Sequence, residues 1–308
     1  MKPTNIPIIY QDHHLLIVNK PAGVVIHPTY KHADGTMWDT ILSYLAQQGG
    51  DDWQPPNLPD EPGWARAPEY IKIMLREKRE QRLWKEDGLL PRPCLLHRLD
   101  KDTSGIVALA RSERSRRHII RQFENHTIVK RYLAVVQQGA LDWSRPRATF
   151  IAKKLRDGAN ETRLTLSSLG DNELILDGPL QRDPDDRRRC IVGPGGQQAT
   201  TVLRVLATNG EFTLLEVRPV TGRLHQIRTH LAAFGYAIVG DQVYAPCGTD
   251  GTPQAALKRQ FLHAYSLELR CYPDNTLCTF VAPLAHDLSM WLEQYFPVGL
   301  GVLHAIPI

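Results

Sequence analysis

The sequence contains few cysteines, no cysteine pair at metal-ligand spacing and no long apolar run. Its five cysteines form no Cys-x-x-Cys motif and leave an odd number, so neither a zinc ribbon nor a disulfide framework is indicated. The apolar runs are far shorter than a membrane span, and the first residues carry no apolar segment behind their charge. We therefore expect a cytoplasmic protein that is neither exported nor embedded in a membrane.

Two common catalytic motifs are also missing. The sequence has no His-Glu-x-x-His motif, so no metal is expected, although a metal-dependent hydrolase remains an alternative that a chelator would reveal. The possible metal ligands are His97, Asp100, His225 and His230. Because there is no Gly-x-Ser-x-Gly elbow, Ser104 is not indicated as a nucleophile.

The charge balance excludes an extreme polyelectrolyte but leaves room for an anionic partner. Lys and Arg number 37 against 33 Asp and Glu in 308 residues. This excess is small, yet the basic residues gather in a few segments, and such clusters can bind a polyanion. A chain of this length can bury a substantial core in one large domain or two ordinary ones.

Hydrophobic periodicity and turn residues predict a mixed α+β fold. Thr36 to Gln48 has apolar residues at helical spacing, and Ser112 can cap a helix whose outer face is basic. Gly235 is placed to end a later helix in a left-handed conformation. The predicted helices are 36–48, 67–86, 112–124 and 224–234. The predicted strands are 15–18, 23–27, 106–110, 128–136, 149–166, 198–206 and 211–217.

Residues 51–92 differ in character from the flanking sequence. Residues 51–63 are rich in proline and have no apolar period, which is typical of an irregular surface loop. Residues 67–86 read as a strongly charged helix, either a solvated face balanced by glutamates or an arm that faces nucleic acid. A second irregular segment, 182–196, carries three consecutive arginines at 187–189. We expect 182–196 to be a loop.

Residues 96–105, Leu-His-Arg-Leu-Asp-Lys-Asp-Thr-Ser-Gly, combine both charge signs with a predicted turn. They lead directly into an apolar strand, so Asp100 would stand at the edge of a sheet on rigid backbone, where catalytic groups are often found. His97 is expected to hold this turn through a backbone hydrogen bond. Lys101 and Asp102 are expected to be structural or to face solvent.

Residues 221–230 form a second dense cluster of functional groups. On a helix, His225, Arg228 and Thr229 are three and four residues apart and reach a common face. Such a face can pair with a carboxylate or a phosphate. Gln226 and His225 are also candidates for holding this helix against the sheet.

Several motifs in a fixed order resemble those of the RluA-type family of pseudouridine synthases, from about residue 10 to residue 285. Segments 97–100 and 103–105 resemble the family's catalytic signature, and 222–230 resembles its arginine-containing motif. The supporting motifs are Asn19 to Gly23, Lys130 to Tyr132, Gly240-Asp241 with Tyr244, and Leu262 to Ala264.

The resemblance implies a mixed, mostly antiparallel sheet flanked by helices and loops, with the catalytic cleft across the sheet. It implies isomerisation of uridine to pseudouridine in rRNA or tRNA, with no cofactor and no obligatory protein partner. The implied catalytic residues are Asp100, Tyr132, which packs against the target base, and Arg228, which pairs with Asp100. The candidate substrate-binding residues are Arg98, which would enter the RNA stack, Lys20, Lys130, Arg223 and Leu262.

The residues themselves leave three points open. An ionised carboxylate can attack the anomeric carbon or carbon 6, or remove a sugar proton. Lys20 either touches a phosphate or lies along Pro21 with its stem buried. An RNA-binding or RNA-folding factor that keeps the scaffold without catalysis is the alternative function.

The resemblance also predicts the domain organisation. Residues 10–300 are expected to form a single catalytic domain, with 51–92 as an insertion and no separate RNA-binding domain before it. Gln197 stands where many relatives have lysine, and both this region and the insertion would affect which RNA is chosen.

Overall fold

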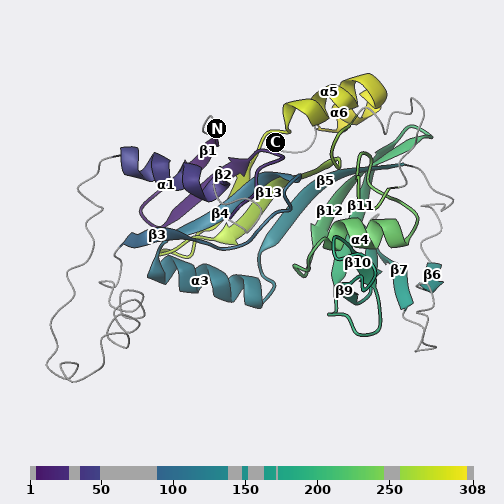
Figure 1. Cartoon of the computed structure of the whole chain (residues 1–308), viewed down its shortest axis with the longest axis horizontal. Coiled ribbons are helices and arrows are strands. Elements are labelled where there is room, and N and C mark those ends of the chain that lie inside the picture. Colours follow the sequence, from purple (N-terminus) through teal and green to yellow (C-terminus); the bar gives the residue numbers. More distant parts are fainter. Residues whose placement is uncertain are drawn as a thin grey trace, which may run out of the picture.

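One large sheet with helices on both faces forms the body of the protein (Figure 1). The computed structural model describes residues 5–27, 35–48, 89–137, 148–151, 163–170, 173–245 and 257–303. Within these ranges the sheet has 12 strands in the order β1-β2-β4-β13-β5-β12-β11-β8-β7-β6, with β14 beside β13 and β3 beside β4. β13 runs parallel to β4, and the other neighbours are antiparallel. The predicted α+β class with a mixed, mostly antiparallel sheet is confirmed.

The predicted strands at 15–18, 106–110, 128–136, 198–206 and 211–217 are present, and the structure adds strands and helices that were not predicted. The strands of the large sheet are β1 (Ile8–Gln11), β2 (Leu15–Lys20), β3 (Leu89–Leu95), β4 (Ser104–Ser112), β5 (Val129–Gln137), β6 (Ala148–Ile151), β7 (Arg163–Gly170), β8 (Glu173–Asp177), β11 (Thr200–Thr208), β12 (Phe212–Pro219), β13 (Leu262–Arg270) and β14 (Leu277–Val281). The helices are α1 (Met37–Gln47), α3 (Glu113–Glu124), α4 (Gln226–Ala233), α5 (His286–Tyr295) and α6 (Pro297–Leu303).

The predicted cap at Ser112 is present, and the structure adds a cap at Thr36. Thr36 and Asp39 form a reciprocal capping box at the start of α1. Ser112 accepts a hydrogen bond from the Ser115 N–H at 3.3 Å at the start of α3. Each cap satisfies a backbone group that the first helical turn leaves without a partner.

The alternation of side chains along β4 places α1 and α3 on opposite faces of the sheet. Ile106 faces one side, where it shares an apolar cluster with Ile119 of α3. Val107 faces the other side and shares a cluster with Met37 and Ile41 of α1. Residues one apart in a strand point to opposite faces, so a single strand supports both layers.

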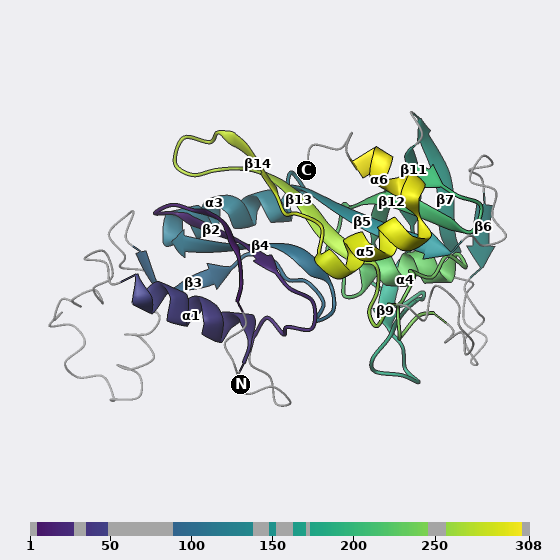
Figure 2. The same ribbon diagram turned by 90° about the horizontal axis from the view of Figure 1, so that it is seen from above.

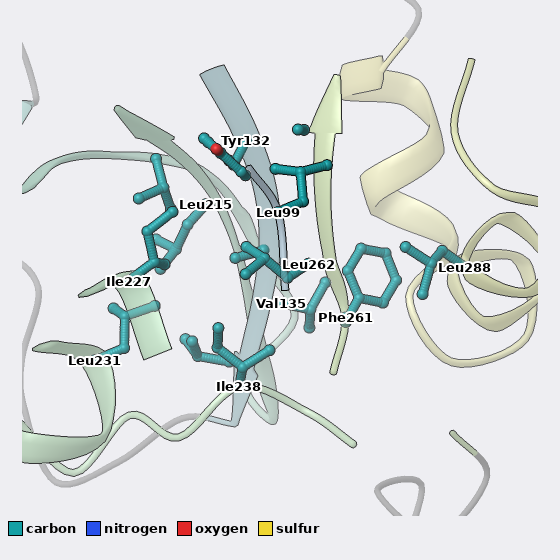
Figure 3. Packing of buried hydrophobic residues seen from close by; sticks show 14 of the residues in the cluster. Leu99, Tyr132, Val135, Leu215, Ile227, Leu231, Ile238, Phe261, Leu262 and Leu288 are labelled. Carbon is teal, nitrogen blue, oxygen red and sulfur yellow. The ribbon is translucent and has the colours of Figure 1, made fainter. Parts of the chain in front are cut away.

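The other half of the sheet, built from β5, β12 and β11, is flanked by α4 and α5 (Figures 1 and 2). Ile227 and Leu231 of α4 and Leu288 of α5 belong to one buried cluster together with residues of the strands between them (Figure 3). This packing fixes the position of α4 relative to β5. That relationship matters because both elements carry predicted site residues.

Three local predictions differ from the structure. Residues 23–27 do not form a strand, because Gly23 adopts a left-handed φ of 80° and its N–H donates to the Lys101 carbonyl at 3.0 Å. The predicted loop 182–196 contains β10 (Cys190–Val192), which pairs with β9 (Leu180–Arg182) in a separate two-stranded sheet. The helix predicted at 224–234 begins at Gln226.

Part of the predicted insertion lies outside the described residues. The proline-rich segment 51–63 and the charged helix 67–86 both fall there, whereas 89–92 belong to β3. The middle of the strand predicted at 149–166 also falls there, with β6 and β7 on either side of it. Within the described helices, none has both the length and the apolar character needed to cross a membrane.

Candidate active site

Asp100 lies in the turn that leads into β4. The Thr103 N–H donates to the Asp100 carbonyl at 3.2 Å and closes this turn. The Asp100 side chain is 20% exposed, so it is partly accessible to solvent.

Lys20 binds the backbone of the turn that carries Asp100. Its side chain is fully buried, and its ammonium group donates to the carbonyls of Pro21, Lys101 and Thr103 at 2.9, 2.8 and 2.8 Å. Burial lowers the pKa of Lys20 to about 7, against the opposing effect of the charges of Asp102 and Asp100. An ammonium group has three N–H donors, so none is left for a phosphate. These contacts favour a structural role for Lys20 over the expected contact with substrate.

Two further side chains fix the same turn from the segment before β13. The Arg259 guanidinium donates to the Asp102 carbonyl at 3.2 Å, and the Gln260 amide donates to the Thr103 hydroxyl at 3.1 Å. The Asp100 backbone therefore stands in a turn that is held on several sides.

Gly105 lets β4 approach β13 at the point where the turn ends. Its φ is +118°, and a Cβ at this position would lie 2.2 Å from the Ala264 carbonyl oxygen. The turn itself is centred on Lys101 and Asp102, whereas Ser104 and Gly105 already belong to β4. The prediction that residues 103–105 form the turn is corrected in this respect.

Arg228 projects from α4 to the Asp100 carboxylate. Its Nη1 donates to Asp100 Oδ2 at 2.9 Å, and its Nε and Nη2 donate to the two carboxylate oxygens of Asp241 at 2.7 and 2.9 Å. The Arg228 side chain is 6% exposed and the Asp241 side chain is fully buried. The two aspartates raise the pKa of Arg228 against the opposing effect of burial, so the guanidinium is charged.

Asp241 fixes the orientation of the guanidinium. Its Oδ1 also accepts the N–H groups of Val243 and Tyr244 at 2.9 and 3.1 Å. A bidentate pair constrains the planar guanidinium. Because Nε and Nη2 are held by Asp241, the remaining nitrogen, Nη1, is directed at Asp100. The pairing implied by the resemblance is therefore present in the structure, and the catalytic role of these residues stays a prediction.

Tyr132 lies on β5, beside Leu99 at one end of the buried cluster (Figure 3). Its side chain is nearly buried, with 8% exposure. Burial, and to a smaller extent the charge of Asp100, raises the pKa of Tyr132, so the phenol remains protonated. The structure thus brings all three predicted catalytic residues to one place.

His225 is a second neighbour of Asp100, and the sequence offered it both for a helix face that pairs with a carboxylate and for holding α4 against the sheet. It precedes α4 with a left-handed φ of 52°. Its Nε2 lies 3.8 Å from Asp100 Oδ2, and its Nδ1 lies 3.1 Å from the Tyr244 hydroxyl. Its spacing of three residues from Arg228 had indicated this position, because it placed both side chains on one face of the predicted helix.

Two predicted structural roles are confirmed. Gln226 ties α4 to β11, since its amide donates to the Thr200 carbonyl at 2.9 Å and the Thr201 hydroxyl at 3.0 Å. His97 accepts the Ala108 N–H at 3.1 Å through Nε2, and burial lowers its pKa to about 3. His97 is therefore a neutral acceptor that holds the loop onto β4.

The remaining candidate substrate-binding residues fall into two groups. Arg98 and Arg223 are exposed, and Arg223 donates from Nε to the Gln198 carbonyl at 3.1 Å. Lys130 is half-buried beside the Thr221 carbonyl, 3.4 Å from Nζ, and burial lowers its pKa to about 8. Leu262 is buried at the start of β13 as part of the core. Only the first group presents a charge to solvent.

The arginine-rich segments are partly neutralised by neighbouring carboxylates. Arg116 and Arg117 of α3 both bind Glu113, at 2.6 and 2.8 Å. In the β9–β10 hairpin, Arg188 binds Asp186 at 2.8 Å, whereas the Arg189 guanidinium lies over the Tyr244 ring at 5.4 Å. The hairpin therefore contacts the same tyrosine that His225 contacts.

The arrangement supplies an accessible carboxylate backed by a buried, fixed cation. A ligand at Asp100 would meet Tyr132 and His225, which offer an aromatic ring and an imidazole. Among the described residues, no group of three or more His, Cys, Asp or Glu side chains is placed to hold a metal ion.

Comparison with known proteins identifies a family for most of the chain. Residues 14–233 match the RNA pseudouridylate synthase family. An uncharacterized RNA pseudouridine synthase of Chloroflexus aurantiacus is 34% identical over 276 residues, which cover 90% of this chain and 65% of that protein. A ribosomal large subunit pseudouridine synthase D of Nitrosomonas europaea is 29% identical over 289 residues, covering 93% of this chain and 64% of that protein. The chain thus spans slightly less than two thirds of the length of these two relatives.

Solved structures show the same fold. Human RNA Pseudouridylate Synthase Domain Containing 4 superposes with a TM-score of 0.57 at 20% identity, covering 93% of this chain and 92% of that one. Human RNA Pseudouridylate Synthase Domain Containing 1 superposes with a TM-score of 0.54 at 18% identity, covering 100% of this chain and 99% of that one. With the family match extending over both motifs that meet at Asp100, the chain belongs to the RNA pseudouridylate synthase family.

Proposed function

We propose that this protein isomerises specific uridines in structured rRNA or tRNA to pseudouridine, with Asp100 as the catalytic carboxylate. The observation that carries the proposal is the accessible Asp100 carboxylate, held at 2.9 Å by the buried Arg228 in a chain of this family. The activity needs no cofactor in this scheme, because the side chains at the site supply its charged groups.

The reaction breaks the bond between the ribose and N1 of uracil, rotates the base and joins it to the ribose through carbon 5. Asp100 serves in attack on the anomeric carbon, attack on carbon 6 or removal of a sugar proton, and each route uses an ionised carboxylate. Arg228 lies against the Asp100 carboxylate at 2.9 Å and orients it for any of these routes.

A uridine in a stacked RNA must leave the stack to reach Asp100. Extrusion costs a few kcal/mol, which contacts with the protein must offset. The ring of Tyr132 supports the extruded base, and the exposed guanidinium of Arg98, two residues before Asp100, enters the gap left in the RNA.

RNA is the proposed partner, and no obligatory protein partner is proposed. Exposed cations around the site, Arg98 and Arg223 among them, would contact phosphates and make binding dependent on salt. Residues 10–300 are proposed to act as one catalytic domain. Its place of action is proposed to be the cytoplasm, where rRNA and tRNA are modified.

The test is release of tritium from RNA labelled at carbon 5 of uridine. Asp100→Asn is expected to abolish release while RNA binding survives, because the amide cannot act as nucleophile or base. Asp274→Asn, on the exposed turn between β13 and β14, serves as the control and is expected to release tritium normally. Full activity in Asp100→Asn would overturn the proposal.

The non-catalytic alternative is tested in cells. If the protein only binds or folds RNA, a strain that lacks it will have an unchanged pseudouridine map. If the proposal holds, one or more sites will be lost and will return with the wild-type gene but not with Asp100→Asn.

A further inference from the structure

His225 occupies an unusual position between the catalytic carboxylate and a buried tyrosine. It lies before the first turn of α4 in a left-handed conformation with a φ of 52°, which is uncommon for any residue other than glycine, although histidine adopts it more often than most side chains do. Its imidazole meets the Tyr244 ring edge to face, with ring centroids 5.8 Å apart, and points its other side at Asp100. Backbone strain at a residue that contacts the site suggests that the placement of the imidazole serves the site.

With the Thr229 hydroxyl as donor, the hydrogen bonds at the Tyr244 hydroxyl assign a tautomer to His225. The hydroxyl oxygen accepts the Cys190 N–H at 2.7 Å and the Thr229 hydroxyl at 3.1 Å, and these two donors occupy its two lone pairs. The single Tyr244 proton is then left for His225 Nδ1, at 3.1 Å. Burial raises the pKa of Tyr244, so this proton is retained. Nδ1 is therefore an acceptor, and the neutral imidazole carries its proton on Nε2.

The Nε2–H of His225 points into the site without a bonded partner among the described residues. Asp100 Oδ2 is 3.8 Å away, beyond hydrogen-bond distance, and already accepts Arg228 Nη1. Burial lowers the pKa of His225 more than the charge of Asp100 raises it, which keeps the ring neutral. A fixed donor thus faces the space beside the reacting carboxylate.

We propose that His225 binds the target nucleotide by donating from Nε2 to an uncharged oxygen, a ribose hydroxyl or a uracil carbonyl, and that Tyr244 holds the tautomer that makes this possible. The inference rests on the proposed function, because it names a contact to the nucleotide on which Asp100 acts. Tyr244 also binds the Cys190 N–H of β10, so the β9–β10 hairpin and the donor are joined through one hydroxyl.

Two substitutions at His225 separate donation from a purely structural role. Glutamine places an amide N–H near the position of Nε2, whereas asparagine is too short to reach it. Asparagine, however, tolerates the left-handed backbone better than glutamine does. If His225 only shapes the backbone, His225→Asn will be the more active variant. If His225 donates to substrate, His225→Gln will be the more active one.

The expected result is a loss in kcat/KM of about 10- to 100-fold in His225→Asn, the usual effect of one lost hydrogen bond, with His225→Gln within about tenfold of wild type. Equal activities, or a more active His225→Asn, overturn the inference. In Asp100→Asn protein, the affinity for an RNA with 2′-deoxyuridine at the target tells the two acceptors apart. This RNA lacks the 2′ oxygen but keeps the uracil carbonyls. Adding His225→Asn to the Asp100→Asn protein should therefore weaken its binding of this RNA if the acceptor is a uracil carbonyl, and should leave it unchanged if the acceptor is the ribose 2′ oxygen.

The tautomer is tested without any turnover. Nitrogen-15 spectra of the wild-type protein are expected to show the Nε2–H form of His225, and Tyr244→Phe is expected to shift it toward the Nδ1–H form. Finding Nδ1–H in the wild type overturns the inference, even if Tyr244→Phe does not fold. If the wild type converts no uridine, the proposed function fails, while the spectra still decide the tautomer.

Discussion

The Arg228 guanidinium and the Asp100 carboxylate are 2.9 Å apart although the two residues are separated by 128 positions in the chain. Asp100 lies in the turn before β4 and Arg228 lies on α4, so the distance between them depends on how α4 packs against the sheet. The guanidinium is held from behind by Asp241, which is fully buried. The accessible carboxylate is therefore the outermost member of a chain of three charges.

Removal of the buried carboxylate is expected to damage both stability and activity. In Asp241→Asn, Arg228 loses a charged bidentate partner, and breaking a buried pair in this way costs about 3–5 kcal/mol. Urea unfolding should show this loss, and tritium release should show a lower kcat. Asp287→Asn is the control, since Asp287 also binds an arginine in bidentate fashion but its side chain is 50% exposed, and it should cost much less.

Gly105→Ala is expected to lower the free energy of unfolding by about 3 kcal/mol or more, or to prevent folding, because the new Cβ would overlap the Ala264 carbonyl. Gly210→Ala shares the positive φ, at 91°, but has no atom within 4 Å of the new Cβ. It should cost about 1 kcal/mol, the conformational part alone. Similar losses in the two variants, measured by urea unfolding, would show that the close approach of β4 to β13 is unimportant.

Lys20→Met tests whether Lys20 holds the Asp100 turn or binds RNA. Three carbonyls lose their donor, so kcat and stability should fall, while RNA affinity and its dependence on salt should not change. Lys101→Met, on the exposed side of the same turn, is the comparison and should keep wild-type stability. A reduced salt dependence in Lys20→Met would instead support a phosphate contact.

Stability is expected to fall as the pH drops below about 6.5, because buried histidines are neutral in the folded protein. Burial lowers the pKa of His230 and His263 to about 4, and both donate or accept through each ring nitrogen. Between pH 6.5 and 4 the unfolded chain binds more protons, so each group lowers the free energy of unfolding by up to about 1.4 kcal/mol per pH unit.

His263→Gln should therefore show a shallower decline over this range than the wild type. His286→Gln, at an exposed position, serves as the control and should follow the wild-type slope. Urea unfolding at three pH values measures both slopes, and parallel curves for wild type and His263→Gln would contradict the explanation.

The arginines around the site should differ in their contribution to RNA binding. Arg223 is exposed beside the site, so Arg223→Ala is expected to weaken RNA binding and to lower the slope of log affinity against log salt by about 1. Arg116 is already paired with Glu113 at 2.6 Å, and Arg116→Ala should change the slope less. An equal effect of both substitutions would mean that Glu113 releases its arginines when RNA binds.

Local sequence signals predicted most of the elements that support the site. Helix α3 begins directly after the capping residue Ser112, and β4 contains the apolar run 106–110 that predicted it. Where a local signal failed, a distant contact had overridden it. Residues 23–27 have strand-like composition, yet Gly23 turns to meet the Lys101 carbonyl, a partner that no nearby residue reveals.

The groups that meet at the candidate site were visible in residues 96–105 and 221–230, because each motif concentrates its functional groups within ten positions and their order in the chain resembles the family. Their meeting was not readable from spacing. The 2.9 Å contact between Asp100 and Arg228, the burial that turns Lys20 inward and the position of His225 between Asp100 and Tyr244 all depend on the packing of α4 and the β4–β13 junction. Hydrogen bonds and ion pairs act over a few ångströms, and only tertiary packing brings groups more than a hundred residues apart to that distance.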